Sequence, residues 1–146
     1  PHVDRWGRGL AHHAAANGHS ALLQSVLTKG ARADSNDFAL QAPLHLAAAS
    51  GHGKIIGKLT QAGAAPNATD SLQRVPLHYA VARGHRSAAA ALLAARAASD
   101  AEDDSQRTAL GYAQTLGHTD LMTILLLKSQ GGGGNLKEQF AEISAA

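Results

Sequence analysis

The chain alternates short apolar, alanine-rich blocks with polar segments that contain glycine, aspartate, asparagine and serine. One set of apolar blocks ends at glycines, namely Gly18, Gly51, Gly84 and Gly117. A second set, for example residues 20–29 and 53–62, ends at Gly30 and Gly63. Because glycine readily takes the left-handed conformation that ends helices, this pattern predicts pairs of short helices. Polar segments between the pairs, such as residues 33–41, predict projecting turns.

The predicted helix pairs recur with a spacing of 33 residues. Gly-His dipeptides occur in that register at Gly18-His19, Gly51-His52, Gly84-His85 and Gly117-His118. The same spacing relates further sets of identical residues, namely Asp4, Asp37, Asp70 and Asp103; Ala14, Ala47, Ala80 and Ala113; Leu44, Leu77 and Leu110; and Leu59, Leu92 and Leu125. Helices this short are unstable alone in water, so each pair must bury its apolar face against its neighbours.

Three segments carry a family resemblance. Residues 43–52 read Pro-Leu-His-Leu-Ala-Ala-Ala-Ser-Gly-His, residues 63–67 read Gly-Ala-Ala-Pro-Asn, and residues 76–85 repeat the first pattern. They resemble ankyrin repeats, over roughly residues 4–130 as four units at about 4–36, 37–69, 70–102 and 103–130. The two outer units depart from the pattern, which is typical of capping units. The resemblance implies an all-α solenoid, a right-handed stack of helix pairs with β-hairpin-like finger loops.

Two departures from the repeat pattern predict local weakness. The helix N-cap, where the resemblance implies Thr, is Gly9, Ala42 and Val75, and only Thr108 keeps the hydroxyl. Each Ala-like cap is expected to cost about 1 kcal/mol. Arg96 stands where other units have glycine. We therefore expect Arg96 in a left-handed conformation, at about 1 kcal/mol.

Composition limits the function classes further. The chain has 146 residues, of which 45% are hydrophobic but only 3% aromatic, so the core must be built from Ala and Leu. The formal net charge is +2 and the pI about 9.3, without the clustered basic patch expected of a nucleic-acid-binding protein. The longest apolar run, residues 121–127, is too short to span a bilayer. The sequence thus predicts a soluble protein that binds no nucleic acid and does not insert into membranes.

The chain also carries hints about its origin. It contains no cysteine, which fits a reducing intracellular location, cytoplasmic or nuclear. It begins at Pro1 without an initiator Met or a signal peptide, which indicates a piece excised from a longer protein.

Nine histidines invite a metal or acid–base interpretation. Most fall into two columns of the repeat, one with His12, His45 and His78, the other with His19, His52, His85 and His118. Stacked helices lie about 8–10 Å apart, whereas zinc needs nitrogens within about 2.1 Å. The resemblance implies that these histidines form structural hydrogen bonds between turns and helices. No spacing supports a catalytic triad, a phosphate loop or a calcium loop. We therefore expect no metal site, no cofactor and no enzymatic activity.

The variable surface remains as a candidate site. In ankyrin-like domains the finger tips and the exposed edge of the first helices form a concave recognition face. Carried onto this chain, that face contains Arg5, Trp6, Arg8, Phe38, Gln41, Leu72, Arg74, Arg83, Asp104, Arg107 and Leu116. Trp and Arg are enriched at binding hot spots. For Trp6 a second interpretation is equally open: its side chain packs on the first repeat as part of an N-terminal cap and does not bind a partner.

After Lys128 the composition changes. Residues 131–134 are four glycines, typical of a flexible linker. In residues 135–146, Leu136, Phe140 and Ile143 form one stripe of a predicted amphipathic helix. Three alternatives stay open for this tail: it docks on the last repeat, it is a linear motif that binds a partner or another copy, or it begins a decayed fifth repeat.

Together these features predict a monomeric, non-catalytic protein-interaction module, an adaptor or scaffold. Its partner would be another protein with an acidic or amphipathic segment. The alternative is a regulatory or targeting domain of a larger enzyme.

Overall fold

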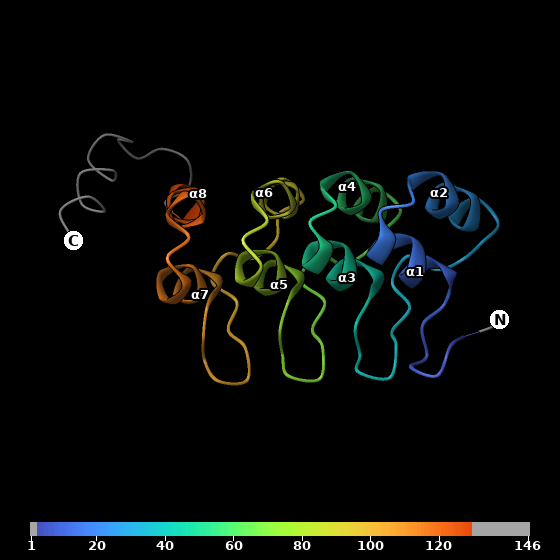
Figure 1. The fold of residues 1–146 in the computed structure, drawn as a ribbon, viewed down its shortest axis with the longest axis horizontal. Coiled ribbons are helices and arrows are strands. Elements are labelled where there is room, and N and C mark those ends of the chain that lie inside the picture. Colours follow the sequence, from blue (N-terminus) through green and yellow to red (C-terminus); the bar gives the residue numbers. More distant parts are fainter. Residues whose placement is uncertain (1–2, 130–146) are drawn as a thin grey trace.

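The computed structural model describes residues 3–129, and this part of the chain contains eight helices and no strand. The helices are α1 (Leu10–Asn17), α2 (Ser20–Thr28), α3 (Pro43–Ser50), α4 (Gly53–Gln61), α5 (Pro76–Ala82), α6 (Arg86–Ala94), α7 (Ala109–Leu116) and α8 (Thr119–Ser129). Figure 1 shows two parallel layers, an inner one of α1, α3, α5 and α7 and an outer one of α2, α4, α6 and α8. A loop projects from the inner layer before each inner helix. The predicted all-α solenoid is confirmed.

The core runs between the two layers along the whole stack. Ala14, Ala47, Ala80 and Ala113, one in each inner helix, are fully buried, and consecutive inner helices contact one another. The lack of a larger side chain at these positions lets the inner helices approach closely. From the outer layer, Leu59 and Leu92 are fully buried and Leu125 nearly so. Each repeat therefore buries its apolar face on its neighbours, as short helices require.

Helix ends lie within one residue of their predicted positions. Gly18, Gly51 and Gly117 are left-handed C-caps, with φ of 72°, 80° and 74°. α5 is the exception, because it ends at Ala82 and is capped by Arg83 in a right-handed conformation; left-handed Gly84 follows. α2 and α4 end at Thr28 and Gln61, one residue earlier than predicted.

The two predicted weaknesses are both present. Arg96 has a φ of 68°, which confirms its left-handed conformation. The Thr108 hydroxyl accepts a hydrogen bond from the Gly111 N–H at 3.2 Å. Gly9, Ala42 and Val75 offer no such side-chain cap.

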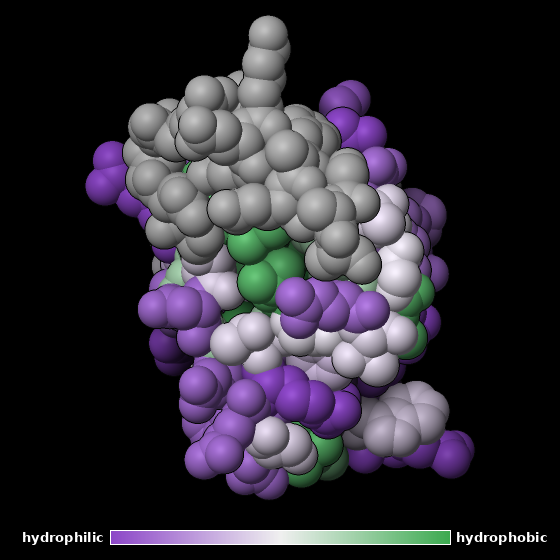
Figure 2. Space-filling model, turned by 90° about the vertical axis from the view of Figure 1, so that its left-hand side faces the viewer, coloured by the Kyte–Doolittle hydropathy of each residue, from purple (hydrophilic) through white to green (hydrophobic). Residues whose placement is uncertain are grey.

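The α8 end of the stack has an apolar surface. Figure 2, which faces this end, shows hydrophobic surface in the middle of its visible part and hydrophilic side chains at its left edge and below. A hollow between α6 and α8 is lined by Ala90, Leu93, Ala94, Ile124, Leu127 and Lys128. The glycine linker 131–134 and the tail residues Leu136, Phe140 and Ile143 lie outside the described residues.

Candidate functional site

The four projecting loops share one turn, which we call the finger tips and define as residues 4–8, 37–41, 70–74 and 103–107. In the second tip, one carboxylate oxygen of Asp37 accepts hydrogen bonds from the N–H groups of Ala39 and Gln41, at 2.9 and 2.8 Å. The Leu40 N–H donates to the Asp37 carbonyl at 3.0 Å. Asp4, Asp70 and Asp103 hold their own tips in the same way. The repeated aspartate therefore fixes the shape of every finger.

Neighbouring finger tips are also joined to each other. The N–H of Phe38 donates to the Trp6 carbonyl at 2.9 Å, and the N–H of Ser71 donates to the Ala39 carbonyl at 3.0 Å. The N–H of Asp104 donates to the Leu72 carbonyl at 2.9 Å. These bonds turn four separate loops into one continuous edge, seen opposite the outer layer in Figure 1.

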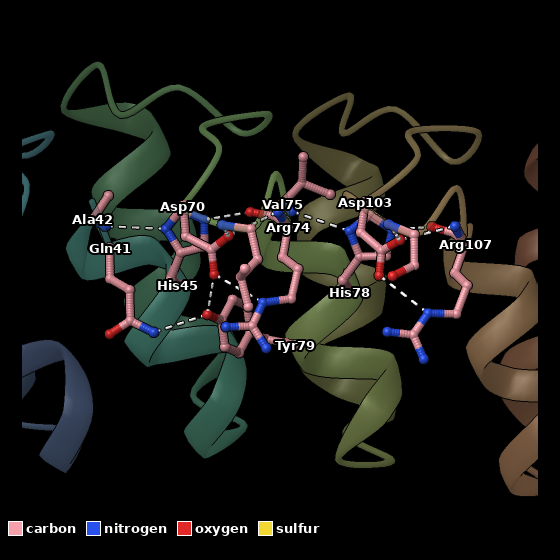
Figure 3. A network of polar contacts seen from close by, with 12 residues as sticks. Gln41, Ala42, His45, Asp70, Arg74, Val75, His78, Tyr79, Asp103 and Arg107 are labelled. Atoms are coloured by element: carbon pink, nitrogen blue, oxygen red, sulfur yellow. Dashed lines mark hydrogen bonds and ion pairs between the residues drawn. The ribbon is translucent and has the colours of Figure 1, made fainter. Parts of the chain in front are cut away.

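A buried histidine in each of the first three repeats connects the fingers to the inner helices. Nδ1 of His45 accepts a hydrogen bond from the Ala42 N–H at 3.0 Å, and its Nε2 lies 3.0 Å from the Arg74 carbonyl (Figure 3). Because Nδ1 accepts, the proton is on Nε2, which donates to that carbonyl. His12 and His78 repeat this arrangement. The predicted structural role of this column is confirmed.

Burial determines the charge state of these histidines. Desolvation lowers the pKa of His12, His45 and His78, and it outweighs the hydrogen bonds to carbonyl groups that act in the opposite direction. All three rings are therefore neutral near pH 7.

The second histidine column packs on glycines. Cβ atoms built at Gly18 and Gly51 would lie 2.8 Å from the rings of His52 and His85, respectively, in the next repeat. His85 Nε2 also lies 3.0 Å from the Ala49 carbonyl. Within residues 3–129, no group of three or more His, Cys, Asp or Glu side chains is arranged to hold a metal ion.

Arg74 and Arg107 are held in place by their own repeats. Nε of Arg74 lies 2.9 Å from Asp70 Oδ2, and its guanidinium carbon lies 4.9 Å from the centre of the Tyr79 ring. Arg107 pairs in the same way with Asp103 at 3.3 Å and stacks on Tyr112 at 4.9 Å. Figure 3 shows the two arginines extending in the same direction. Sequence reasoning missed these arrangements, although each tyrosine follows the finger aspartate by nine residues.

The same contacts set the protonation of the aspartates and tyrosines. Burial alone would raise the pKa of Asp103, but hydrogen bonds from the Tyr112 hydroxyl and the Arg107 and Ser105 N–H groups lower it to about 2. Desolvation and the hydrogen bond to Asp70 raise the pKa of Tyr79 to about 12. At neutral pH each pair is therefore a neutral phenol donating to a carboxylate.

Arg8 behaves differently, because its own aspartate has another partner. Asp4 meets His13 Nε2 at 2.9 Å, so Arg8 reaches into the next repeat. There its Nε lies 3.3 Å from Asp37, and a terminal nitrogen lies 3.5 Å from the Gln41 side-chain oxygen. The second repeat lacks an arginine and a tyrosine of its own at the two corresponding positions, which leaves Asp37 available. Arg8 thus ties the first two repeats together.

Large apolar side chains are exposed at the finger tips. Trp6 is 56% exposed and Phe38 is 75% exposed. The guanidinium carbons of Arg5 and Arg8 lie 5.4 and 5.8 Å from the Trp6 ring centre. The Phe38 ring covers Gly7, where a Cβ would lie 2.6 Å from it. Trp6 is thus not buried under the first repeat but stays largely exposed, with two arginines close to its ring.

The other candidate residues surround this edge. Leu72 and Asp104 are exposed on the third and fourth tips, and Arg83 and Leu116 are exposed at the ends of α5 and α7. Gln41 is half-buried, and its Nε2 donates to the Tyr79 hydroxyl at 2.8 Å. The structure therefore arranges the candidates along the fingers and the ends of the inner helices.

Comparison with known proteins identifies the repeat. A family model of ankyrin repeats in three copies matches residues 1–70 and 44–137. Comparison with curated proteins gives no match. In residues 3–129, none of the helices has both the length and the apolar character needed to cross a membrane. With its repeat, its fold and this match in agreement, the chain belongs to the ankyrin repeat family.

Proposed function

We propose that this chain is a non-catalytic adaptor or scaffold module that binds a partner polypeptide along the finger tips and the exposed ends of the inner helices. Ankyrin repeats are generally protein–protein interaction modules and typically non-catalytic. The absence of cysteine supports an intracellular setting, cytoplasmic or nuclear, and we propose that the module acts as a monomer.

One observation carries the proposal, namely the uneven distribution of exposed apolar side chains. Among the described residues, Trp6, Phe38, Leu40 and Leu72 are exposed on the finger tips, Val3 and Leu10 flank the first tip in the sequence and are exposed too, and Leu116 is exposed at the end of α7. The outer helices α2, α4, α6 and α8 expose a single large hydrophobic residue, Leu22. Exposed apolar residues gathered on one edge are typical of interaction sites.

The finger tips are also held in a fixed conformation before any partner binds. Side-chain hydrogen bonds hold each tip, backbone hydrogen bonds join the tips, and two arginines stack on the Trp6 ring. A rigid surface loses little conformational freedom on association, which raises affinity. Tryptophan flanked by arginine is a frequent composition for a hot spot.

A random peptide library displayed on phage and selected on the purified 146-residue chain tests this proposal. We expect Trp6→Ala and Phe38→Ala each to weaken the selected peptides by about tenfold or more. Leu22→Ala, which removes an exposed leucine from α2, is the matched control and should leave affinity unchanged. Selected peptides that bind both finger variants normally, or that lose affinity with Leu22→Ala, would place binding elsewhere.

A further inference from the structure

Arg74 and Arg107 present their terminal nitrogens outward in a fixed orientation. The Nε atom of each is engaged by an aspartate whose side chain is at most 3% exposed, and a tyrosine ring lies under each guanidinium. Within the described residues, no acceptor contacts the terminal nitrogens of either arginine. A guanidinium fork held in this way is ready to donate two hydrogen bonds to one carboxylate.

The charge that a partner meets at these positions is positive. The side chains of Asp70 and Asp103 are almost fully buried, whereas those of Arg74 and Arg107 are 35% and 59% exposed. Arg5, stacked on Trp6, adds an exposed cation at the other end of the edge. Asp104 is exposed on the fourth tip and opposes this charge there.

Each arginine also has a defined place in the repeat. Arg8, Arg74 and Arg107 directly precede the N-cap residues of α1, α5 and α7. They therefore lie where the fingers meet the inner helices, and we call these three residues the arginine row.

The distance between neighbouring positions of the arginine row indicates the backbone conformation of the partner segment. Equivalent atoms of neighbouring repeats are separated by about the distance between packed helices, 8–10 Å. A polyproline II helix advances about 3.1 Å per residue and has three residues per turn, so every third side chain points the same way about 9 Å further on. In a β-strand the third residue points to the opposite face. A polyproline II segment therefore matches the arginine row, and a strand does not.

We infer that the partner segment is an acidic polypeptide in the polyproline II conformation, with a carboxylate at every third residue. Carboxylates of this segment bind the terminal nitrogens of Arg74 and Arg107, and the segment runs along the arginine row toward Arg8 and the Trp6 ring. Exposed aromatic rings suit such a segment, because aromatic surfaces bind proline-rich polyproline II helices. This inference rests on the proposed function and specifies the chemistry of the partner.

Fluorescence anisotropy with synthetic peptides tests the inference. The probe is a labelled, capped twelve-residue peptide, (Pro-Pro-Glu)4. The first control, (Glu-Pro-Glu-Pro-Pro-Pro)2, has the same composition but alternates glutamate intervals of two and four residues. The second control, (Pro-Pro-Lys)4, reverses the charge. We expect the regular acidic peptide to bind about tenfold more tightly than the first control, more weakly at higher salt, and the lysine peptide not to bind.

Variants of the intact chain test whether the regular acidic peptide binds at the arginine row. We expect Arg107→Gln to weaken the regular peptide about fivefold and to reduce its advantage over the first control. Arg107→Lys keeps the charge but loses the planar fork, so it should also reduce that advantage. Arg86→Gln, on outer helix α6, makes the same charge change away from the row and should have no effect. Circular dichroism verifies that each variant is folded.

Equal binding of the two acidic peptides, no binding of the regular one, or an unchanged preference in both Arg107 variants would overturn the inference. If library peptides still depend on Phe38 while the regular acidic peptide fails, the proposed function stands and only the partner chemistry is wrong. If no peptide depends on the finger tips, the proposed function itself fails.

Discussion

Leu40, Gln73 and Gln106 occupy left-handed backbone conformations in the finger tips, with φ of 61°, 62° and 64°. The first tip has Gly7 at the equivalent position, with a φ of 79°. A side chain costs free energy in this region because its Cβ approaches the following carbonyl. The finger tips keep this conformation because the aspartate and the inter-finger hydrogen bonds hold the neighbouring backbone.

Arg96 carries the same strain without such support. It is exposed, and it follows α6 at the place where Gly63 follows α4. We expect Arg96→Gly to raise the free energy of unfolding by about 0.5–1 kcal/mol, because the strain removed exceeds the added freedom of the unfolded chain. Urea unfolding followed by circular dichroism measures this change. Gly63→Ala is the reciprocal control and should lower stability, since φ there is 99° although the space is open. A less stable Arg96→Gly variant would refute the assigned strain.

Helix α4 contains a residue that lowers its stability. Gly57 lies in the middle of the helix, and a Cβ built there meets no atom within 4 Å. Glycine inside a helix is less favourable than alanine by about 0.5–1 kcal/mol. We therefore expect Gly57→Ala to raise the free energy of unfolding by about 0.5–1 kcal/mol and to shift the urea midpoint upward.

Gly53, at the start of the same helix, provides the control. A Cβ built there would lie 3.2 Å from the Ser87 carbonyl oxygen of the neighbouring repeat. Gly53→Ala should therefore bring no gain or lower the midpoint. Equal gains from both substitutions would show that α4 and α6 pack less closely than described.

The histidine joints between fingers and inner helices predict sensitivity to acid. Folding lowers the pKa of His12, His45 and His78 below the ordinary value of 6.5 because they are buried. As pH falls below 6.5 the unfolded chain binds protons that the folded chain does not, so folded stability decreases. Each histidine that stays neutral contributes up to about 1.4 kcal/mol per pH unit.

Urea unfolding at pH 7.5 and 5.5 measures this dependence. We expect a lower unfolding free energy at pH 5.5. His13→Asn serves as the control, because His13 is exposed and paired with Asp4, and this variant should keep most of the difference. Equal stability at the two pH values would contradict neutral buried rings.

For the whole molecule, the sequence pattern predicts the fold more fully than the site. The positions of Gly18, Gly51 and Gly117 in the sequence predict where α1, α3 and α7 end, because a left-handed cap is a local property. The partner of Arg8 is not local. It reaches Asp37 because His13 occupies Asp4 and the second repeat offers Asp37 neither an arginine nor a tyrosine of its own. The ion-pair partner of a side chain thus depends on residues of two neighbouring repeats. The 33-residue spacing of identical residues does not contain this information.

Position in the stack should determine what each repeat contributes to stability. Leu77 in α5 is fully buried, and α5 contacts both α3 and α7. Leu110, its equivalent in α7, is only partly buried. We expect Leu77→Ala to reduce the free energy of unfolding by about 3 kcal/mol and Leu110→Ala by about 1 kcal/mol. Urea unfolding of the two variants measures both losses, and equal losses would contradict a stack held by nearest neighbours.

We propose that binding takes place on the finger edge and that the outer layer only supports it. Hydrogen exchange followed by mass spectrometry, with and without a saturating library-selected peptide, tests this most directly. We expect slower exchange in residues 4–8, 37–41, 70–74 and 103–107 and at the ends of the inner helices, with α2, α4, α6 and α8 unchanged. Protection confined to those outer helices, with no change in the finger tips, would contradict it.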